Sequence, residues 1–479
     1  MGVYKDGLFY LLLYLPFYWL FSLLQRLYWI CNGMHNIVTE IEDGQLYERS
    51  AQVFDIRYKV KKEPFQVLSR RNFIATHRMF EHPNYVLSYN ISLLAVEMDQ
   101  AIFVEVPVTY DIFDCRKSPF VHLGQFKEAV RIITMPISSL IRCAEELGDP
   151  KMKIIWLHST GRCGSTAMSQ VFEAIPNCTT LSEPMCLFVA RNEAAARYST
   201  KQYRKWLNSK RYKNMCQAAV RLMAKPNEHN PDILFIKNFT LSGLMEVEGI
   251  EKCFPTHINL FLYRDCLETV QSYLRSLNNH FFLNVVMKLR GSTFTRYIIR
   301  SPKLLIKSLA APDALDLHPW MTDPDNHLSM TSFGLVVIQW CCFLSHYKYL
   351  VSRKGSLLGA IRYEDIVDQR HATLTKLFQF CEVPLEYVEL AKKSLETDSQ
   401  EGTVLSKSSL EKFKKVHVTD SLRDEANMYL KACSLSPLGQ PTYLPNALSP
   451  NVGTDNSSES ITGLHSAPLN THISISMPA

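Results

Sequence analysis

The sequence lacks the patterns that mark a metalloprotein or a nucleic-acid-binding protein. Its 13 cysteines form no CxxC pair and no Cys/His spacing of a zinc site, and their odd number excludes complete pairing within the chain. A net charge of +6 over 479 residues is too small to indicate nucleic-acid binding, although it favours a small anionic ligand. No acidic cluster indicates a catalytic metal. We therefore expect a folded protein that binds a small anion without a metal.

One stretch, residues 153–187, has the arrangement of an anion-binding site. The apolar run 154–157 is typical of a buried strand, the small-residue loop 159–164 follows it, and residues 165–174 have a helical pattern. Such a loop lets backbone N–H groups converge at the positive end of a helix. Glu183 follows the next apolar stretch. We expect it to project toward the same loop, because the carboxyl ends of parallel strands share one edge of a sheet.

This loop lacks the lysine of a Walker A motif. That motif ends in Gly-Lys-Ser/Thr, whereas Gly164 is followed directly by Ser165 and Thr166, and the only cation is Arg162. A strand-end aspartate for Mg²⁺ is also missing, since Asp265 begins a helix. A kinase-like or NTPase-like nucleotide-binding protein is the alternative interpretation, although both of these features are missing.

The loop resembles the P-loop of the sulfotransferases, which has Lys or Arg, any residue, Gly and then two Ser/Thr residues. The residues that fit this pattern position for position are Arg162, Cys163, Gly164, Ser165 and Thr166. The resemblance implies that they, with Gly161, hold the 5′-phosphosulfate end of 3′-phosphoadenosine 5′-phosphosulfate (PAPS), the co-substrate. A glycine-bearing turn in an ordinary α/β domain is the other interpretation.

A second pair of residues resembles the site for the 3′-phosphate of that donor. Arg264 ends the apolar strand 257–263, and Ser272 lies about two turns into the following helix. Sulfotransferases hold the 3′-phosphate with an Arg and a Ser at the same separation of eight positions. An arginine fork suits a phosphate dianion. The alternative is a helix-start ion pair between Arg264 and Asp265.

The general base is identified by resemblance as Glu183. Cytosolic sulfotransferases place a His two residues after the lysine that corresponds to Lys237, but Phe239 stands there. Golgi carbohydrate sulfotransferases are similar to this chain in having Glu-Pro at the end of the second strand, which Glu183 and Pro184 match. The resemblance implies Glu183 as base, Arg162 at the leaving phosphate and Lys237 at the sulfuryl group.

Other roles stay open for these residues. Glu183 could form a salt bridge to Arg162 or cap a helix, and Lys237 could be a solvated lysine. The missing His keeps an inactive, membrane-tethered relic as a further alternative. The active enzyme would move a sulfuryl group from PAPS to an acceptor hydroxyl, with a carbohydrate or glycoconjugate as the expected acceptor.

Alternating strand and helix patterns from 151 to about 397 predict an α/β fold. The resemblance makes it a P-loop-type three-layer sandwich with a central parallel sheet, preceded by an N-terminal α+β region. In that region we expect strands within 52–60 and 84–111 and one or two helices across 118–147. The expected divisions are an anchor (1–39), the N-terminal region (40–150), the sulfotransferase-like domain (151–433) and a disordered tail (434–479).

Two further segments resemble parts of the family. Residues 362–365, Arg-Tyr-Glu-Asp, match its late strand, which is a signature of the fold rather than of catalysis. Residues 398–403 loosely resemble the glycine loop that closes over the donor.

The N-terminus contains a long uncharged segment. Residues 8–24 have no charge, and after Gln25 and Arg26 four more apolar residues follow. A spanning helix needs roughly 20 apolar residues. No small-residue cleavage site is present, so we expect an uncleaved membrane anchor, with the Golgi as the candidate location. A buried or interfacial helix, and with it a cytoplasmic enzyme, is the alternative.

Overall fold

The structure is a computed structural model of the chain. The residues that it describes are 3–4, 9–61, 66–114, 117–226, 231–240, 244–254, 257–278, 306–322, 330–353, 358–397, 399–400 and 406–449.

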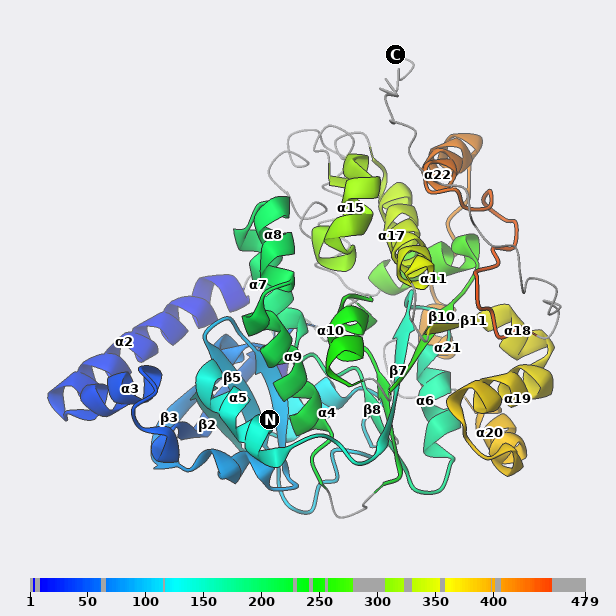
Figure 1. Cartoon of the computed structure of the whole chain (residues 1–479). Coiled ribbons are helices and arrows are strands. Elements are labelled where there is room, and N and C mark those ends of the chain that lie inside the picture. Colours follow the sequence, from blue (N-terminus) through cyan, green and yellow to red (C-terminus); the bar gives the residue numbers. More distant parts are fainter. Residues whose placement is uncertain are drawn as a thin grey trace.

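A five-stranded parallel sheet forms the centre of the molecule (Figure 1). Its strands are β7 (Lys153–Ser159), β8 (Cys178–Ser182), β9 (Ile233–Lys237), β10 (Ile258–Tyr263) and β11 (Leu358–Arg362), in the order β11-β10-β7-β9-β8. All neighbouring strands are parallel. The strand order reverses at β7, and ligands of such sheets bind at the carboxyl ends of the strands around that point. The loop after β7 lies there.

Helices cover both faces of this sheet. On one face, Ile155 and Leu157 of β7 pack with α6 (Ser165–Glu173), α18 (Tyr363–Asp368), α19 (Arg370–Cys381) and α20 (Val388–Ser394). On the other face are α9 (Lys210–Met223), α10 (Met245–Cys253), α11 (Cys266–Asn278), α17 (Ser332–Ser352) and α22 (Asp420–Ala432). Successive side chains of a strand point to opposite faces, so a nearly all-apolar strand serves both layers. The three-layer α/β prediction is confirmed.

A second, six-stranded sheet precedes it in the chain. It contains β1 (Val3–Tyr4), β2 (Ala51–Lys61), β3 (Phe73–Glu81), β4 (Ile91–Val96), β5 (Gln100–Glu105) and β6 (Arg131–Pro136). Apart from the parallel pair β1–β2, its strands are antiparallel. α4 (Val121–Glu128) and α5 (Ile137–Leu147) belong to the same region. One apolar cluster joins Val53, Phe103 and Leu140 of this region to Trp156 and Ala219, so the two sheets share a core.

Two helices, α4 and α5, lie within 118–147 as expected. The expectation misses a strand between them, because Arg131–Pro136 forms β6, which pairs with β2 and β5. The run Ile132-Ile133-Thr134 is β-branched and suits a buried strand.

Residues 434–449, which were expected to belong to a disordered tail, are packed against the domain. Leu435, Leu438 and Leu444 are buried against α17 and α22, and the amide of Leu448 donates to the carbonyl of Ala360 in β11 at 2.8 Å. The low charge of this segment favoured the prediction of disorder over a packed role for its spaced leucines. Residues 450–479 lie outside the described part of the chain.

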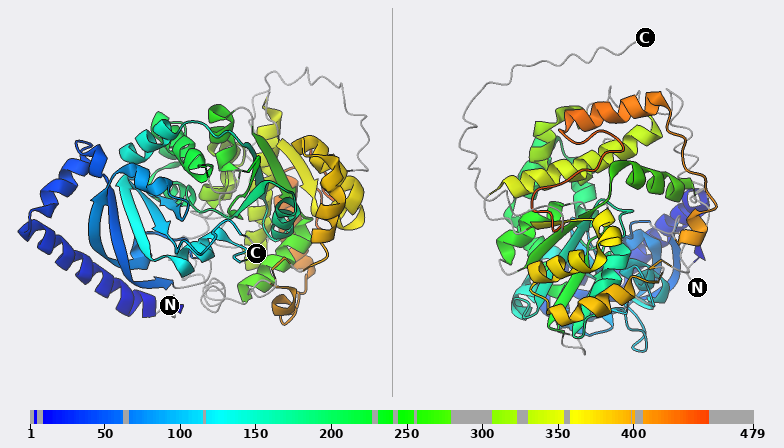
Figure 2. Two further views of the ribbon diagram at one scale, coloured as in Figure 1. Left: turned by 90° about the horizontal axis from the view of Figure 1, so that it is seen from below. Right: turned by 90° about the vertical axis from the view of Figure 1, so that its right-hand side faces the viewer.

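The N-terminal segment forms η1 (Tyr10–Tyr14), α2 (Leu15–Cys31) and α3 (Met34–Glu42). The helix α2 runs along the outside of the antiparallel sheet (Figure 2). Within the described residues, no helix has both the length and the apolar character needed to cross a bilayer. The membrane anchor stays a prediction.

A buried ion pair beneath the parallel sheet gives a test of the packing. Arg191 of α7 (Phe188–Arg197) lies 2.6 Å from Glu246 of α10, and both side chains are at most 2% exposed. Arg191→Met should lower the free energy of unfolding by about 3–5 kcal/mol, because it leaves Glu246 buried without its cation. Chemical denaturation measures this. Arg197→Met, in the exposed pair with Glu193, is the control and should change stability by less than about 1 kcal/mol. Equal losses in both variants would contradict the packing.

Candidate functional site

The loop between β7 and α6 depends on close contacts at its glycines. Gly161 and Gly164 have φ of 72° and 83°. A Cβ on Gly161 would lie 2.2 Å from the hydroxyl of Tyr273, and one on Gly164 would lie 2.4 Å from the ring of Tyr363. Only glycine fits such contacts and readily adopts positive φ. These two positions before α6 therefore have no side chain, which suits an anion-binding loop.

Arg162 also has a positive φ, 54°, which is uncommon for a residue with a side chain. Its Nε donates to Ser272 Oγ at 3.1 Å. The structure thus joins the loop to α11, the two segments that the sequence predicts as donor-binding.

The charge of Arg162 has no carboxylate partner within the described part of the chain. Burial lowers the pKa of its guanidinium, and the nearby charges of Arg275 and Arg264 lower it further. The Nε of Arg275 is itself buried without a hydrogen-bond partner among the described residues. Arginines crowded in this way favour a bound anion, because an anion would offset both their repulsion and their desolvation. Sequence reasoning missed Arg275, which lies only three residues beyond Ser272.

Arg264 lies at the rim of the same site. Its Nη2 donates to Glu268 at 3.2 Å, and its guanidinium lies over the ring of Tyr363, 5.0 Å from the centroid. The expected alternative partner, Asp265, is instead held by both arms of Arg362, at 2.7 and 3.2 Å. Arg264 therefore forms a helix-start ion pair with Glu268 instead of Asp265, and its side chain is still 24% exposed.

The segment 362–365 fixes the two halves of the site against each other. Arg362 clamps Asp265 at the start of α11, and Glu364 accepts from the backbone amide of Asp265 at 3.2 Å. Tyr363 packs on Gly164 of the loop and beneath Arg264. This role in positioning agrees with the expectation of a fold signature.

Glu183 and Lys237 form a buried ion pair beside the loop. Lys237 Nζ donates to Glu183 Oε1 at 2.7 Å and to Thr166 Oγ1 at 3.1 Å, and the Lys237 side chain is 1% exposed. Lys237 is therefore not a solvated lysine, and the partner of Glu183 is Lys237 rather than Arg162. A φ of 57° turns Glu183 toward the loop. One lysine thus links the anion loop to the candidate base.

The N-terminal region supplies a wall of this site that the sequence did not indicate. The ring centroid of Phe120 lies 4.7 Å from Lys237 Nζ, and His122 Nδ1 lies 3.3 Å from the carbonyl oxygen of Glu183. Burial holds the pKa of His122 well below its usual range, and the charge of Lys61 adds to this effect. A neutral His122 therefore supports the backbone of Glu183. No local signal could have found this contact, because it joins residues 61 positions apart.

Gln400 is a second contact that sequence reasoning missed. Its Nε2 donates to Thr166 Oγ1 at 3.1 Å, and Arg162 Nη1 lies 3.5 Å from its Oε1. The side chain of Gln400 therefore lies against both ends of the anion loop. Residues 398 and 401–403, four of the six residues of the expected glycine loop, lie outside the described part of the chain.

His158, which directly precedes the loop, is buried. Its Nε2 lies 3.3 Å from Asn259 Oδ1, and its Nδ1 lies 3.2 Å from Asn238 Nδ2. Both ring nitrogens are thus engaged in a buried network, so His158 is structural.

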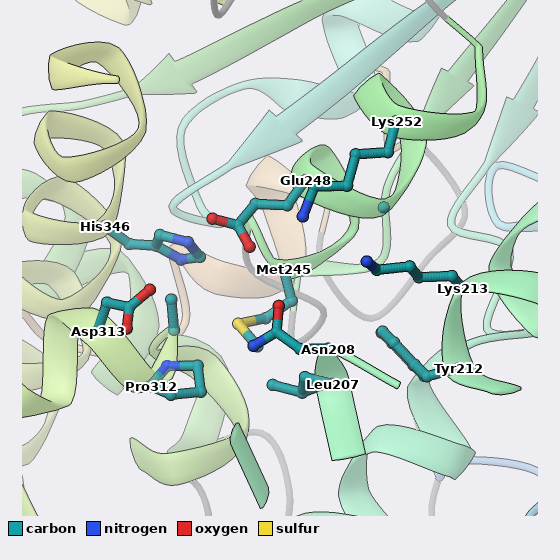
Figure 3. A pocket seen from close by; sticks show the side chains of 12 residues that line it. Leu207, Asn208, Tyr212, Lys213, Met245, Glu248, Lys252, Pro312, Asp313 and His346 are labelled. Carbon is teal, nitrogen blue, oxygen red and sulfur yellow. The ribbon is translucent and has the colours of Figure 1, made fainter. Parts of the chain in front are cut away.

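A separate pocket opens between α8 (Thr200–Leu207), α9, α10, α15 (Pro312–Leu317) and α17 (Figure 3). Side chains of both charges point into it, among them Lys213, Lys252 and Glu248. Burial lowers the pKa of His346, on its wall, to about 3. Glu248 pairs with Arg353, and none of the predicted site residues lines this pocket.

Comparisons with known proteins gave structural similarities only. No family model matches the chain, and no curated protein matches it. The sulfotransferase domain from the curacin biosynthetic pathway is 17% identical with a TM-score of 0.33, over 61% of this chain and 100% of the other. Sulfotransferase STF1 from Mycobacterium tuberculosis is 11% identical with a TM-score of 0.33, over 62% and 81%. These scores are too low to establish a fold or a function for this chain.

The contact between Gly164 and Tyr363 can be tested with a matched pair of variants. Gly164→Ala and Gly33→Ala both place a Cβ at a left-handed backbone position, but only the first meets another atom within 4 Å. Both should lose about 1 kcal/mol for the backbone, and Gly164→Ala should lose about 1–3 kcal/mol more from overpacking. Thermal and denaturant unfolding measure the difference. Equal losses would show that the loop does not rest on Tyr363.

Proposed function

We propose that the protein is a sulfotransferase that moves a sulfuryl group from PAPS to an acceptor hydroxyl. The observation that carries this proposal is the 3.1 Å contact between Arg162 Nε and Ser272 Oγ. It joins two segments 110 residues apart, each of which resembles one part of a PAPS site. Both segments follow the adjacent parallel strands β7 and β10, so they meet at the carboxyl edge of the sheet.

The residues present fit this donor. The loop from Gly161 to Thr166 would bind the 5′-phosphosulfate, and Arg264 with Ser272 would bind the 3′-phosphate. The uncompensated charge of Arg162 supports an anionic ligand, and charge-assisted contacts from arginine are among the strongest in proteins. Arg275 would add a further positive charge.

The chemistry requires one bond to form and one to break. The acceptor oxygen would bond to sulfur while the bond from sulfur to the phosphate oxygen breaks, and the hydroxyl proton would pass to the carboxylate of Glu183. Arg162 would stabilise the charge that develops on the leaving phosphate. Lys237, which contacts both Thr166 and Glu183, would hold the base beside the reacting groups.

A carbohydrate or glycoconjugate is the proposed acceptor, and the Golgi is the proposed location. Both rest on the resemblance of Glu183-Pro184 to the Golgi carbohydrate enzymes.

A nucleotide-binding protein of the kinase or NTPase type is the second candidate. The buried amine of Lys237 lies 3.1 Å from Thr166 in the loop, so a lysine does reach this loop from a neighbouring strand. Binding assays with ATP and GTP separate this candidate from the first. Labelled-sulfate transfer from PAPS to a panel of acceptors separates an active enzyme from an inactive relic.

The donor assignment predicts a preference for a 3′-phosphate. 3′-Phosphoadenosine 5′-phosphate (PAP) should bind about 10- to 150-fold more tightly than AMP, because one charge-assisted contact contributes about 1.5–3 kcal/mol. Arg264→Ala should remove this preference without weakening AMP, as isothermal calorimetry can measure. Glu268→Gln is the matched variant: it frees Arg264 from its carboxylate and should strengthen PAP binding or leave it unchanged. Equal affinity of the native chain for PAP and AMP would exclude the assignment.

The base assignment predicts a kinetic defect that stability does not explain. Glu183→Gln should reduce turnover by about 10²–10⁴-fold, with PAP affinity retained. The same change also leaves Lys237 buried without its anion and should cost about 3–5 kcal/mol of stability.

The double variant Glu183→Gln, Lys237→Met separates the two effects. It removes both charges, so stability should largely recover while turnover stays low. Recovery of turnover together with stability would show that Glu183 is structural.

A further inference from the structure

The outward face of the N-terminal helix is a concentrated apolar surface. Nineteen large apolar side chains are exposed in the described part of the chain, and ten of them lie in η1 and α2, where they are 49–63% exposed. Half of the exposed apolar side chains on two elements is a patch rather than the normal scatter. We call it the apolar stripe: Leu12, Leu13, Phe17, Trp19, Leu20, Leu23, Leu24, Leu27, Tyr28 and Ile30.

The opposite face of the helix is fastened to the antiparallel sheet. Tyr10, Tyr14 and Tyr18, spaced four residues apart, bury against β2 and β3. Tyr14 Oη donates to the carbonyl of Arg71 at 3.0 Å, and Gln25 Nε2 donates to that of Ala75 at 3.3 Å. These contacts fix the rotation of the helix, so the exposed apolar stripe points away from the sheet.

Positive charge lines one flank of this stripe. From residue 9 to residue 30 the sequence has no carboxylate, and its single charge is the exposed Arg26. Arg26 is seven residues, about two turns, after Trp19, so the two lie on one side of the helix. The exposed guanidinium of Arg71 lies over the Trp19 ring, 5.2 Å from its centroid. Two cations on one edge complement a negatively charged surface.

The chemistry of the stripe favours lipid over a protein partner. A protein interface carries about one hydrogen bond per 100–200 Å². Apart from Arg26, the exposed side chains between Leu12 and Ile30 offer only the ring N–H of Trp19 and the hydroxyl of Tyr28 as polar groups. Trp and Tyr beside apolar residues are typical of the membrane–water interface.

We propose that α2 lies in the plane of an anionic membrane surface. The apolar stripe would enter the boundary between headgroups and acyl chains, with Arg26 and Arg71 at the lipid phosphates. The sheet occupies the other face of the helix, so α2 attaches this folded chain to one leaflet without crossing it. This inference is independent of the proposed transferase activity.

Flotation of the full chain with vesicles tests the proposal. The protein should float with vesicles of phosphatidylcholine and phosphatidylserine, and less with phosphatidylcholine alone. Arg26→Glu and Arg71→Glu should each weaken binding to the anionic vesicles by at least about fivefold, the effect of one cation near the surface. Leu20→Asp with Leu24→Asp should abolish flotation. Val108→Asp, at an even more exposed apolar position outside the stripe, should change nothing.

Brominated lipids then distinguish a lying helix from a spanning one. Quenching of tryptophan fluorescence should disappear in Trp19→Phe and persist in Trp29→Phe, because Trp29 packs on Phe54 and His77 of the sheet. Quenching that depends equally on both residues would mean that the helix leaves the sheet and spans.

Two other outcomes would overturn the proposal. One is flotation that survives the double aspartate variant. The other is a dimer in light scattering that breaks on that variant and shows no binding to vesicles, which would assign the stripe to a second copy.

Discussion

Two tyrosine rings resting on two glycines hold the anion loop in place. Tyr273 of α11 abuts Gly161, and Tyr363, the first residue of α18, abuts Gly164. The hydroxyl of Tyr273 lies 3.3 Å from the carbonyl of Thr160 and receives a hydrogen bond from Gln339 of α17 at 3.1 Å. Three elements from the second half of the chain therefore meet on one loop from the first half. The two glycines that suit this loop to an anion also permit the close packing of the tyrosine rings.

Charge is distributed unevenly around this contact. Arg362 forms an ion pair with Asp265, and Arg264 forms one with Glu268. Arg162 has only hydroxyl and amide partners among the described residues. A half-buried guanidinium without a counter-ion is costly, and the surrounding scaffold must be stable enough to bear it. The clamp between Arg362 and Asp265 supplies part of that scaffold. The ion pairs of Arg362 and Arg264 thus lie beside Arg162, which has no counter-ion among the described residues, as expected where a ligand supplies the anion.

The sequence predicted those features whose signals are local. The strands at 154–157 and 257–263, the small-residue loop and the order of the parallel domain all depend on short apolar runs and turn residues, and they are confirmed. The partners of side chains depend on tertiary packing and were harder to predict. Lys237 was open to a solvated role because nothing nearby in sequence shows that Phe120 and Glu183 enclose it. β6 was missed because its β-branched run lies between two helical patterns.

The N-terminal region is mechanically part of the candidate site. His122 contacts the carbonyl of Glu183, and Phe120 packs on Lys237, so the base is held partly by α4 and the segment before it. The same region carries α2 on its outer sheet face and shares its core with β7 and α9. The helix α2 and the wall of the site therefore belong to the same packed region. If the helix lies on a membrane, the candidate site therefore has one fixed orientation relative to the lipid.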